Sequence, residues 1–216
     1  RAGSKRIKNK NIKFFNGKPI IFWIIKKLKK NKKVKKIAVS SDDTKILNLC
    51  RKYGVNDLIK RSKKLSNDKT PFQKVIVDTI KKLKIIKKNK VKILVVFPCA
   101  YFLTNFHISK AINLLDRNPK SFIMSVGTYS HPIQRAYKIE KNKLKYFNKR
   151  FELQRTQDLK KSYFDAGQFY LGYSKTWLTK KVHSNSVGMV MPKERTIDID
   201  DLEDWKFAEK LSKIIE

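Results

Sequence analysis

Long hydrophobic runs, cysteines and a secretory signal are all missing or scarce in this sequence. No apolar run exceeds about eleven residues, whereas a membrane-spanning helix needs about 20. No signal peptide is recognisable, although the chain begins at Arg1 and not at Met. The two cysteines, Cys50 and Cys99, form neither a disulfide framework nor a metal-binding pattern. We therefore expect a protein that does not enter the membrane and works in the reducing cytoplasm.

Acidic residues are also scarce. The chain has 18 Asp and Glu against 52 Lys and Arg, which gives a formal net charge of +34. Such a charge suggests nucleic-acid binding, but 43 of the 52 cations are Lys and they recur along the whole chain. No RRM, zinc-finger or helix-turn-helix signature is present. A solvated lysine surface is favoured and nucleic acid is not an expected partner; a basic nucleic-acid-binding module without enzymatic activity stays the alternative.

The few carboxylates are not spread evenly. Residues 158–216 hold 10 of the 18, and five of these fall within seven positions: Asp198, Asp200, Asp201, Glu203 and Asp204. In an extended segment alternate residues share a face, so the first two carboxylates can bind one Mg²⁺ beside phosphate oxygens. The alternative is that Asp200 and Asp201 only cap the helix that follows.

Apolar patterns separated by turn residues predict strands and helices in alternation through the first half of the chain. We expect strands over 34–40, 57–59, 91–97 and 121–126, and helices over 20–28, 44–53, 71–87 and 108–116. This order indicates a single α/β domain over 1–216, Rossmann-like, with a mostly parallel sheet and helices on both faces.

The pattern changes after Thr128. A hairpin over 135–147, a polar stretch over 148–166 and a strand over 168–173 predict a small β-rich insertion over 128–173. The main sheet is expected to resume near 187–191, and a last helix is expected over 202–215.

The N-terminal segment carries a glycine together with hydroxyl and cationic side chains. Arg1, Gly3, Ser4 and Lys5 form a loop whose amides and cations can surround a triphosphate. The segment lacks the ending of a Walker A loop, so an ATPase of that type is excluded. A frayed basic terminus is the alternative for this segment taken alone.

The segments described above resemble, in order, the signatures of the sugar-acid cytidylyltransferases, the enzymes that make CMP-sialic acid and CMP-Kdo. The matching segments are 1–11, 39–43, Arg61 with 68–71, and 198–205. Segments 131–136, 155–159 and 163–172 resemble the members of that family that act on pseudaminic acid.

The sequence departs from the family pattern at several positions. The first strand of the family, which precedes the N-terminal signature, is absent ahead of Arg1. Ser62 replaces a Pro, and segment 97–103 loses two polar residues of a stretch that lines the sugar pocket in related enzymes.

The resemblance implies a fold of the nucleotide-diphospho-sugar transferase type and a reaction that transfers CMP from CTP to a nine-carbon 2-keto sugar acid. Pseudaminic acid is the expected sugar, with legionaminic or N-acetylneuraminic acid as alternatives. It also implies a Mg²⁺ cofactor held by Asp198 and Asp200, which form the catalytic group together with Lys10. The nucleotide would be bound by Arg1, Ser4, Lys5, Lys10, Asn11, Arg61 and Thr70, and the sugar by Arg155, Gln168 and Tyr170. A homodimer formed through the insertion is the expected assembly.

Overall fold

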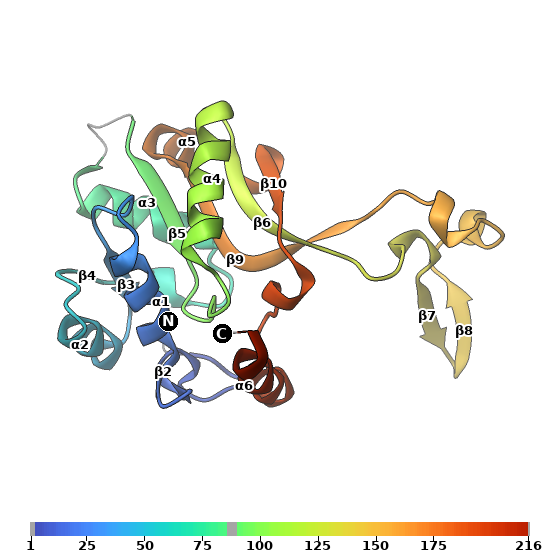
Figure 1. Ribbon diagram of the computed structural model, residues 1–216, viewed down its shortest axis with the longest axis horizontal. Helices are drawn as coiled ribbons and strands as arrows, with labels where there is room; N and C mark the ends of the chain where they lie inside the picture. Colours follow the sequence, from blue (N-terminus) through green and yellow to red (C-terminus); the bar gives the residue numbers. More distant parts are fainter. Residues whose placement is uncertain (1–2, 86–89, 216) are drawn as a thin grey trace.

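The structure of the protein is a computed structural model that describes residues 3–85 and 90–215. Its centre is a four-stranded sheet in the order β10-β6-β9-β5 (Figure 1). The strands of this sheet are β5 (Lys92–Val96), β6 (Phe122–Thr128), β9 (Tyr163–Tyr173) and β10 (Ser186–Val190). The helices are α1 (Ile20–Lys30), α2 (Thr44–Lys52), α3 (Phe72–Lys82), α4 (Asn105–Arg117), α5 (Ser174–Thr179) and α6 (Leu202–Ile215).

Helices cover both faces of the central sheet, as predicted. Leu94 and Val96 of β5 pack with α1, α2 and α4, whereas the alternate residues Ile93 and Val95 pack with α3 and α5. Successive side chains of a strand point to opposite faces of the sheet, and those of β5 are apolar on both faces. The sheet therefore has a hydrophobic core on each side.

Strand β9 lies in the middle of the sheet and runs antiparallel to both of its neighbours. The other three strands share one direction. The insertion predicted over 128–173 is wrong for residues 168–173, because these belong to β9 of the central sheet. Phe169 and Leu171 are buried in one core and Tyr170 in the other. The segment is apolar on both faces, and only a position inside the sheet, with helices on both sides, removes both faces from water.

The part that leaves the sheet is therefore residues 129–162, here called the arm, and it is shorter than the insertion predicted over 128–173. The arm carries the hairpin of β7 (Tyr137–Glu140) and β8 (Lys143–Tyr146) and projects away from the body (Figure 1). Lys141 and Asn142 at its turn both have positive φ. That is the backbone geometry of the tight turn expected there.

Strands β3 (Ala38–Ser41) and β4 (Asp57–Lys60) form a separate parallel pair. Within the described residues they make no ladder with the central sheet, but Val39 and Leu58 pack into the same core as α1 and α4.

A third core attaches the two ends of the described chain to each other. Trp205 and Ala208 of α6 pack with Phe15, which belongs to the short strand β1 (Phe14–Phe15) that pairs with β2 (Lys18–Pro19). Ile7 and Ile199 are buried in the same core. The N-terminal loop is thereby fixed beside the acidic segment, which places the candidate site. None of the described helices is both long and apolar enough to cross a membrane.

Candidate active site

A cleft of about 250 Å³ opens where the N-terminal loop, the end of β5, β9 and the acidic segment meet. Its lining is polar on one side and apolar on the other. The lining residues are Lys10, Asn11, Phe97, Pro98, Cys99, Gly167, Gln168, Ile197 and Asp198.

Cations of the N-terminal loop face the acidic segment directly. The Lys10 Nζ donates to the Ile199 carbonyl oxygen at 2.6 Å and lies 3.5 Å from Asp200 Oδ1. The Arg6 Nη2 lies 2.8 Å from the same carboxylate oxygen. Residues nearly 190 positions apart thus form one charged group, and the loop is not a frayed terminus.

The helix-capping alternative is resolved by the backbone contacts of the acidic segment. Asp201 Oδ1 accepts from the amides of Glu203 and Asp204, and Asp204 Oδ2 accepts from the amides of Asp200 and Asp201. Capping of α6 is therefore done by Asp201 and Asp204. Asp198 lines the cleft, and the Asp200 carboxylate pairs with Arg6 and Lys10 and does not cap the helix.

Asp198 is the more unusual of these two carboxylates. Although it opens onto solvent, partial removal of its hydration by the cleft wall raises its pKa above the ordinary value, and the Asp200 charge adds to the rise. Lys10 acts in the opposite direction. The two carboxylates therefore repel each other, and a bound cation would relieve that repulsion.

The residues predicted to bind the nucleotide are only partly brought together. Lys10 and Asn11 line the cleft, and Ser4 and Lys5 lie in the same loop. The Lys5 Nζ forms an ion pair with Asp68 at 2.7 Å, which ties the N-terminal loop to the segment after β4.

Arg61 and Thr70 belong to that segment after β4. The Arg61 Nη2 donates to the Ser40 carbonyl oxygen at 2.7 Å, at the end of β3. The Thr70 hydroxyl donates to the Lys64 carbonyl oxygen at 3.0 Å. Arg1 lies outside the described residues.

Of the residues predicted to bind the sugar, Gln168 is in the wall of the cleft. It is only 2% exposed, and its Nε2 donates to the carbonyl oxygens of Ala166 and Ile197 at 3.0 and 3.3 Å. The Ser125 hydroxyl accepts from the Gln168 and Phe169 amides, which locks the chain at the bulge between β6 and β9.

Tyr170 is buried beside the cleft, and its hydroxyl donates to Asp165. Arg155, in contrast, belongs to the arm and is paired with Asp158 at 2.8 Å. A single chain does not bring Arg155 to the cleft.

The floor of the cleft is formed by the segment that departs from the family pattern. Phe97 and Pro98 offer no polar side-chain group, and burial raises the pKa of the Cys99 thiol to about 11. This side of the cleft therefore contacts a substrate mainly through apolar surface.

Three residues in or near the site were missed by the sequence analysis, namely Arg6, Asp68 and Asp165. Arg6 follows Lys5 in a loop already identified as phosphate-binding, so its position was a usable signal. Asp68 and Asp165 lie within segments that carry the family resemblance, but their partners are distant in the chain, and a sequence pattern does not indicate such pairs.

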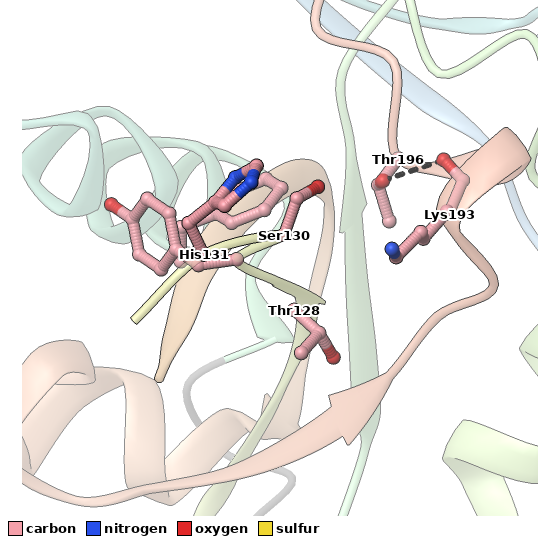
Figure 2. Close-up of a pocket in the computed structure, with 7 residues that line it drawn as sticks. Thr128, Ser130, His131, Lys193 and Thr196 are labelled. Carbon is pink, nitrogen blue, oxygen red and sulfur yellow. Dashed lines mark hydrogen bonds between the residues drawn. The ribbon is translucent and has the colours of Figure 1, made fainter. Parts of the chain in front are cut away.

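A second cavity of about 400 Å³ lies at the base of the arm. Figure 2 shows Thr128, Ser130 and His131 on one side of it and Lys193 with Thr196 on the other. Phe164 also lines it, and none of the residues that line this cavity also lines the cleft. This cavity is therefore separate from the cleft.

Comparison with known proteins agrees with this geometry. A family profile described as cytidylyltransferase matches residues 1–174. In solved structures, CMP:2-keto-3-deoxy-manno-octonic acid synthetase in complex with CTP aligns with 99% of this chain and 95% of that chain, at a TM-score of 0.68 and 12% identity. 4-Diphosphocytidyl-2C-methyl-D-erythritol synthase aligns with 94% of this chain and 92% of its own, with the same TM-score and 11% identity. The fold is therefore of the nucleotidyltransferase type, as predicted.

The sequence relatives narrow this class. Pseudaminic acid cytidylyltransferase of Campylobacter jejuni is 33% identical over 99% of this chain and 94% of its own length. N-acylneuraminate cytidylyltransferase B of Danio rerio is 27% identical over 97% of this chain and 49% of its own length. The chain belongs to the cytidylyltransferase family, and the predicted family is confirmed.

Proposed function

We propose that this protein transfers CMP from CTP to pseudaminic acid, a nine-carbon 2-keto sugar acid, and releases pyrophosphate. The product is an activated CMP-sugar for surface glycan or flagellin glycosylation, made in the cytoplasm. The observation that carries the proposal is that Lys10 and Asp198 line one cleft of a cytidylyltransferase fold while Lys10 also lies 3.5 Å from the Asp200 carboxylate. The full-length similarity to a pseudaminic acid cytidylyltransferase supports the choice of sugar.

The N-terminal loop supplies the cations for the triphosphate. Lys5, Arg6 and Lys10 are held near the cleft by carboxylates or a carbonyl oxygen, and CTP phosphates would replace these partners. Asn11, Arg61 and Thr70 are the proposed contacts for ribose and base. Arg1 and Ser4 would complete the loop around the phosphates.

The anomeric hydroxyl of the sugar attacks the α-phosphorus, and the new O–P bond forms as the bond to pyrophosphate breaks in line. The hydroxyl proton leaves to water, and negative charge spreads over the phosphoryl oxygens. Lys10 is placed to stabilise that charge, because its side chain is only 20% exposed and its amine already faces the Asp200 carboxylate. Positioning and charge neutralisation therefore supply most of the proposed rate enhancement.

Asp198 and Asp200 fit a Mg²⁺ ion. Among the described residues no three His, Cys, Asp or Glu side chains converge on one point. Mg²⁺ commonly takes one or two carboxylates and completes its shell with water and substrate phosphates, so a pair suffices. When bound, the ion would polarise the phosphate oxygens and make the sugar hydroxyl more acidic.

The sugar is proposed to lie between the apolar floor at 97–99 and the β9 wall, where Gln168 lines the cleft and Tyr170 packs against Phe97. Arg155 would reach the sugar carboxylate from the arm of a second copy, because it is remote from the cleft of its own chain. A homodimer is therefore part of the proposal.

Replacing Asp200 by Ala tests the site. We expect loss of Mg²⁺-dependent pyrophosphate release from CTP and pseudaminic acid, measured by a coupled phosphate assay. Asp201→Ser is the matched control, since it keeps an α6 cap and removes a neighbouring carboxylate. Turnover that survives in Asp200→Ala, or is lost equally in the control, contradicts the assignment. Mass spectrometry of products from pseudaminic, legionaminic and N-acetylneuraminic acids identifies the sugar.

A further inference from the structure

Tyr170 is held rigidly beside the cleft by aromatic contacts. Its side chain is 4% exposed, and its ring stacks on Phe72 at 4.7 Å between centroids. Phe97, which lines the cleft, meets the same ring edge-on at 5.9 Å. The ring therefore has one position, and its hydroxyl is fixed at one point.

That hydroxyl forms a pair with Asp165, a residue to which no role has been given above. The Tyr170 hydroxyl donates to Asp165 Oδ2, and the Gly167 amide donates to Asp165 Oδ1 at 3.0 Å. Both oxygens of the carboxylate are thus oriented by β9 itself, although Asp165 is exposed to solvent.

The bonding leaves the pair able only to accept hydrogen bonds. A phenol has one proton, and here that proton is committed to the carboxylate, which has none of its own at neutral pH. Burial, Asp165 and Asp198 all raise the pKa of Tyr170, so the phenol stays protonated. The oxygen of the buried Tyr170 hydroxyl can therefore only accept a hydrogen bond from a donor on a ligand.

Gly167 connects the pair to the catalytic carboxylates. It lines the cleft, and a Cβ atom built on it would lie 3.7 Å from Asp198 Oδ2. The remaining sugar-side wall is apolar at Phe97 and Pro98. A fixed acceptor beside an apolar floor selects ligands that carry a hydroxyl or amide N–H at that place, since a ligand without one leaves the buried Tyr170 oxygen without a donor.

We propose that Asp165 is a positioning residue that orients the Tyr170 hydroxyl, and that this hydroxyl recognises a hydroxyl or amide N–H donor of the sugar acid. This inference rests on the proposed function, because it names what the same site recognises on its second substrate. Asp165 takes no part in the transfer of the phosphoryl group.

The test is steady-state kinetics of the full chain, with pseudaminic acid and CTP varied in turn. We expect Asp165→Ala to raise the KM for the sugar about tenfold, the cost of one lost hydrogen bond, while kcat and the KM for CTP change little. Asp165→Asn, which can still accept from the Tyr170 hydroxyl, should recover most of that loss. Tyr170→Phe should also raise the sugar KM, and adding Asp165→Ala to it should cause no further change.

Asp116→Ala is the matched control, because Asp116 accepts a hydrogen bond from Tyr173 at the other end of β9. It removes a similar Asp–Tyr pair and should leave the sugar KM unchanged. Thermal melting with and without CTP shows whether each variant keeps its fold and its nucleotide site.

Several outcomes overturn the proposal. These are an unchanged sugar KM in Asp165→Ala, an equal rise in the KM for CTP, or additive effects of the two substitutions. If the wild-type chain turns over none of the nonulosonic acids, the proposed function itself fails and this inference fails with it. If the wild type turns over a nonulosonic acid and the Asp165 variants keep its KM for that sugar, only this inference is wrong and the proposed function stands.

Discussion

Gly167 has a φ of +59°, a backbone conformation that a residue with a Cβ adopts at a cost of about 1–2 kcal/mol. We expect Gly167→Ala to lower the free energy of unfolding by about that amount and also to reduce turnover, because the new methyl group would lie against the Asp198 carboxylate. Urea unfolding and initial rates measure the two effects.

Gly17 provides the control for that experiment. Its φ is +76°, and a Cβ added there meets nothing within 4 Å. Gly17→Ala should therefore lose similar stability and keep its turnover. A Gly167→Ala protein as stable and as active as the wild type would show that neither the strain nor the contact matters.

Cys99 gives a pH-dependent prediction. Burial, with smaller contributions from Asp198 and Asp200, raises its pKa to about 11 against the opposing effect of Lys10. Only the thiolate reacts with iodoacetamide, and at pH 8 about one thousandth of such thiols is ionised, against about a quarter at an ordinary pKa near 8.5.

Labelling of Cys99 in the folded protein should accordingly be slow at pH 8 and accelerate as the pH approaches 11. Unfolded protein in urea should react rapidly at pH 8. Peptide mapping by mass spectrometry measures the rates for Cys99 and for Cys50, whose pKa is raised to about 11 by burial as well. Rapid labelling of Cys99 in the folded chain would contradict the raised pKa of this thiol in the floor of the cleft.

At the scale of elements, the sequence predicts the ends of a helix well where capping residues lie next to those ends. The sequence predicts a helix over 44–53, and α2 occupies Thr44–Lys52. Asp43 accepts from the Lys45 amide at its start, and Gly54 takes a φ of +70° just after its end. The last helix was predicted over 202–215 and α6 occupies those residues. Such boundaries depend on residues within one turn of each other, which is why a single sequence shows them.

The position and direction of β9 had no such local signal. Its pairing with β5 and β6 depends on residues some 40 to 80 positions away, and an apolar run says nothing about which way a strand runs in a sheet. The same reason separates the site residues that were predicted from those that were not. Alternation placed Asp198 and Asp200 together, whereas the Arg6–Asp200 and Asp165–Tyr170 pairs arise only when distant segments meet.

At the scale of the whole molecule, the net charge of +34 does not define the function. The cations that serve the proposed chemistry are few, and the clearest, Lys10, has a side chain that is only 20% exposed.

The exposed apolar surface of the arm says more about the whole molecule than its charge does. Eight large hydrophobic residues of segment 129–163 are exposed, namely Tyr129, Ile133, Tyr137, Ile139, Leu144, Phe147, Leu153 and Tyr163. An isolated hairpin is marginally stable in water, so the arm needs a partner surface.

That need leads to a prediction about assembly. Ile139 and Leu144 are cross-strand partners in the arm and are 73% and 68% exposed. If arms pair, the wild type sediments as a dimer in analytical ultracentrifugation, and Ile139→Asp with Leu144→Asp gives a monomer, because each buried charge would be unpaired. The monomer should still bind CTP but lose sugar turnover, since Arg155 would no longer reach a partner's cleft. Ile214→Asp, on a residue 79% exposed outside the arm, is the control and should stay dimeric. A monomeric wild type, or a double variant that remains dimeric and active, would refute this assembly. Arg155 would then have no role in a partner's cleft.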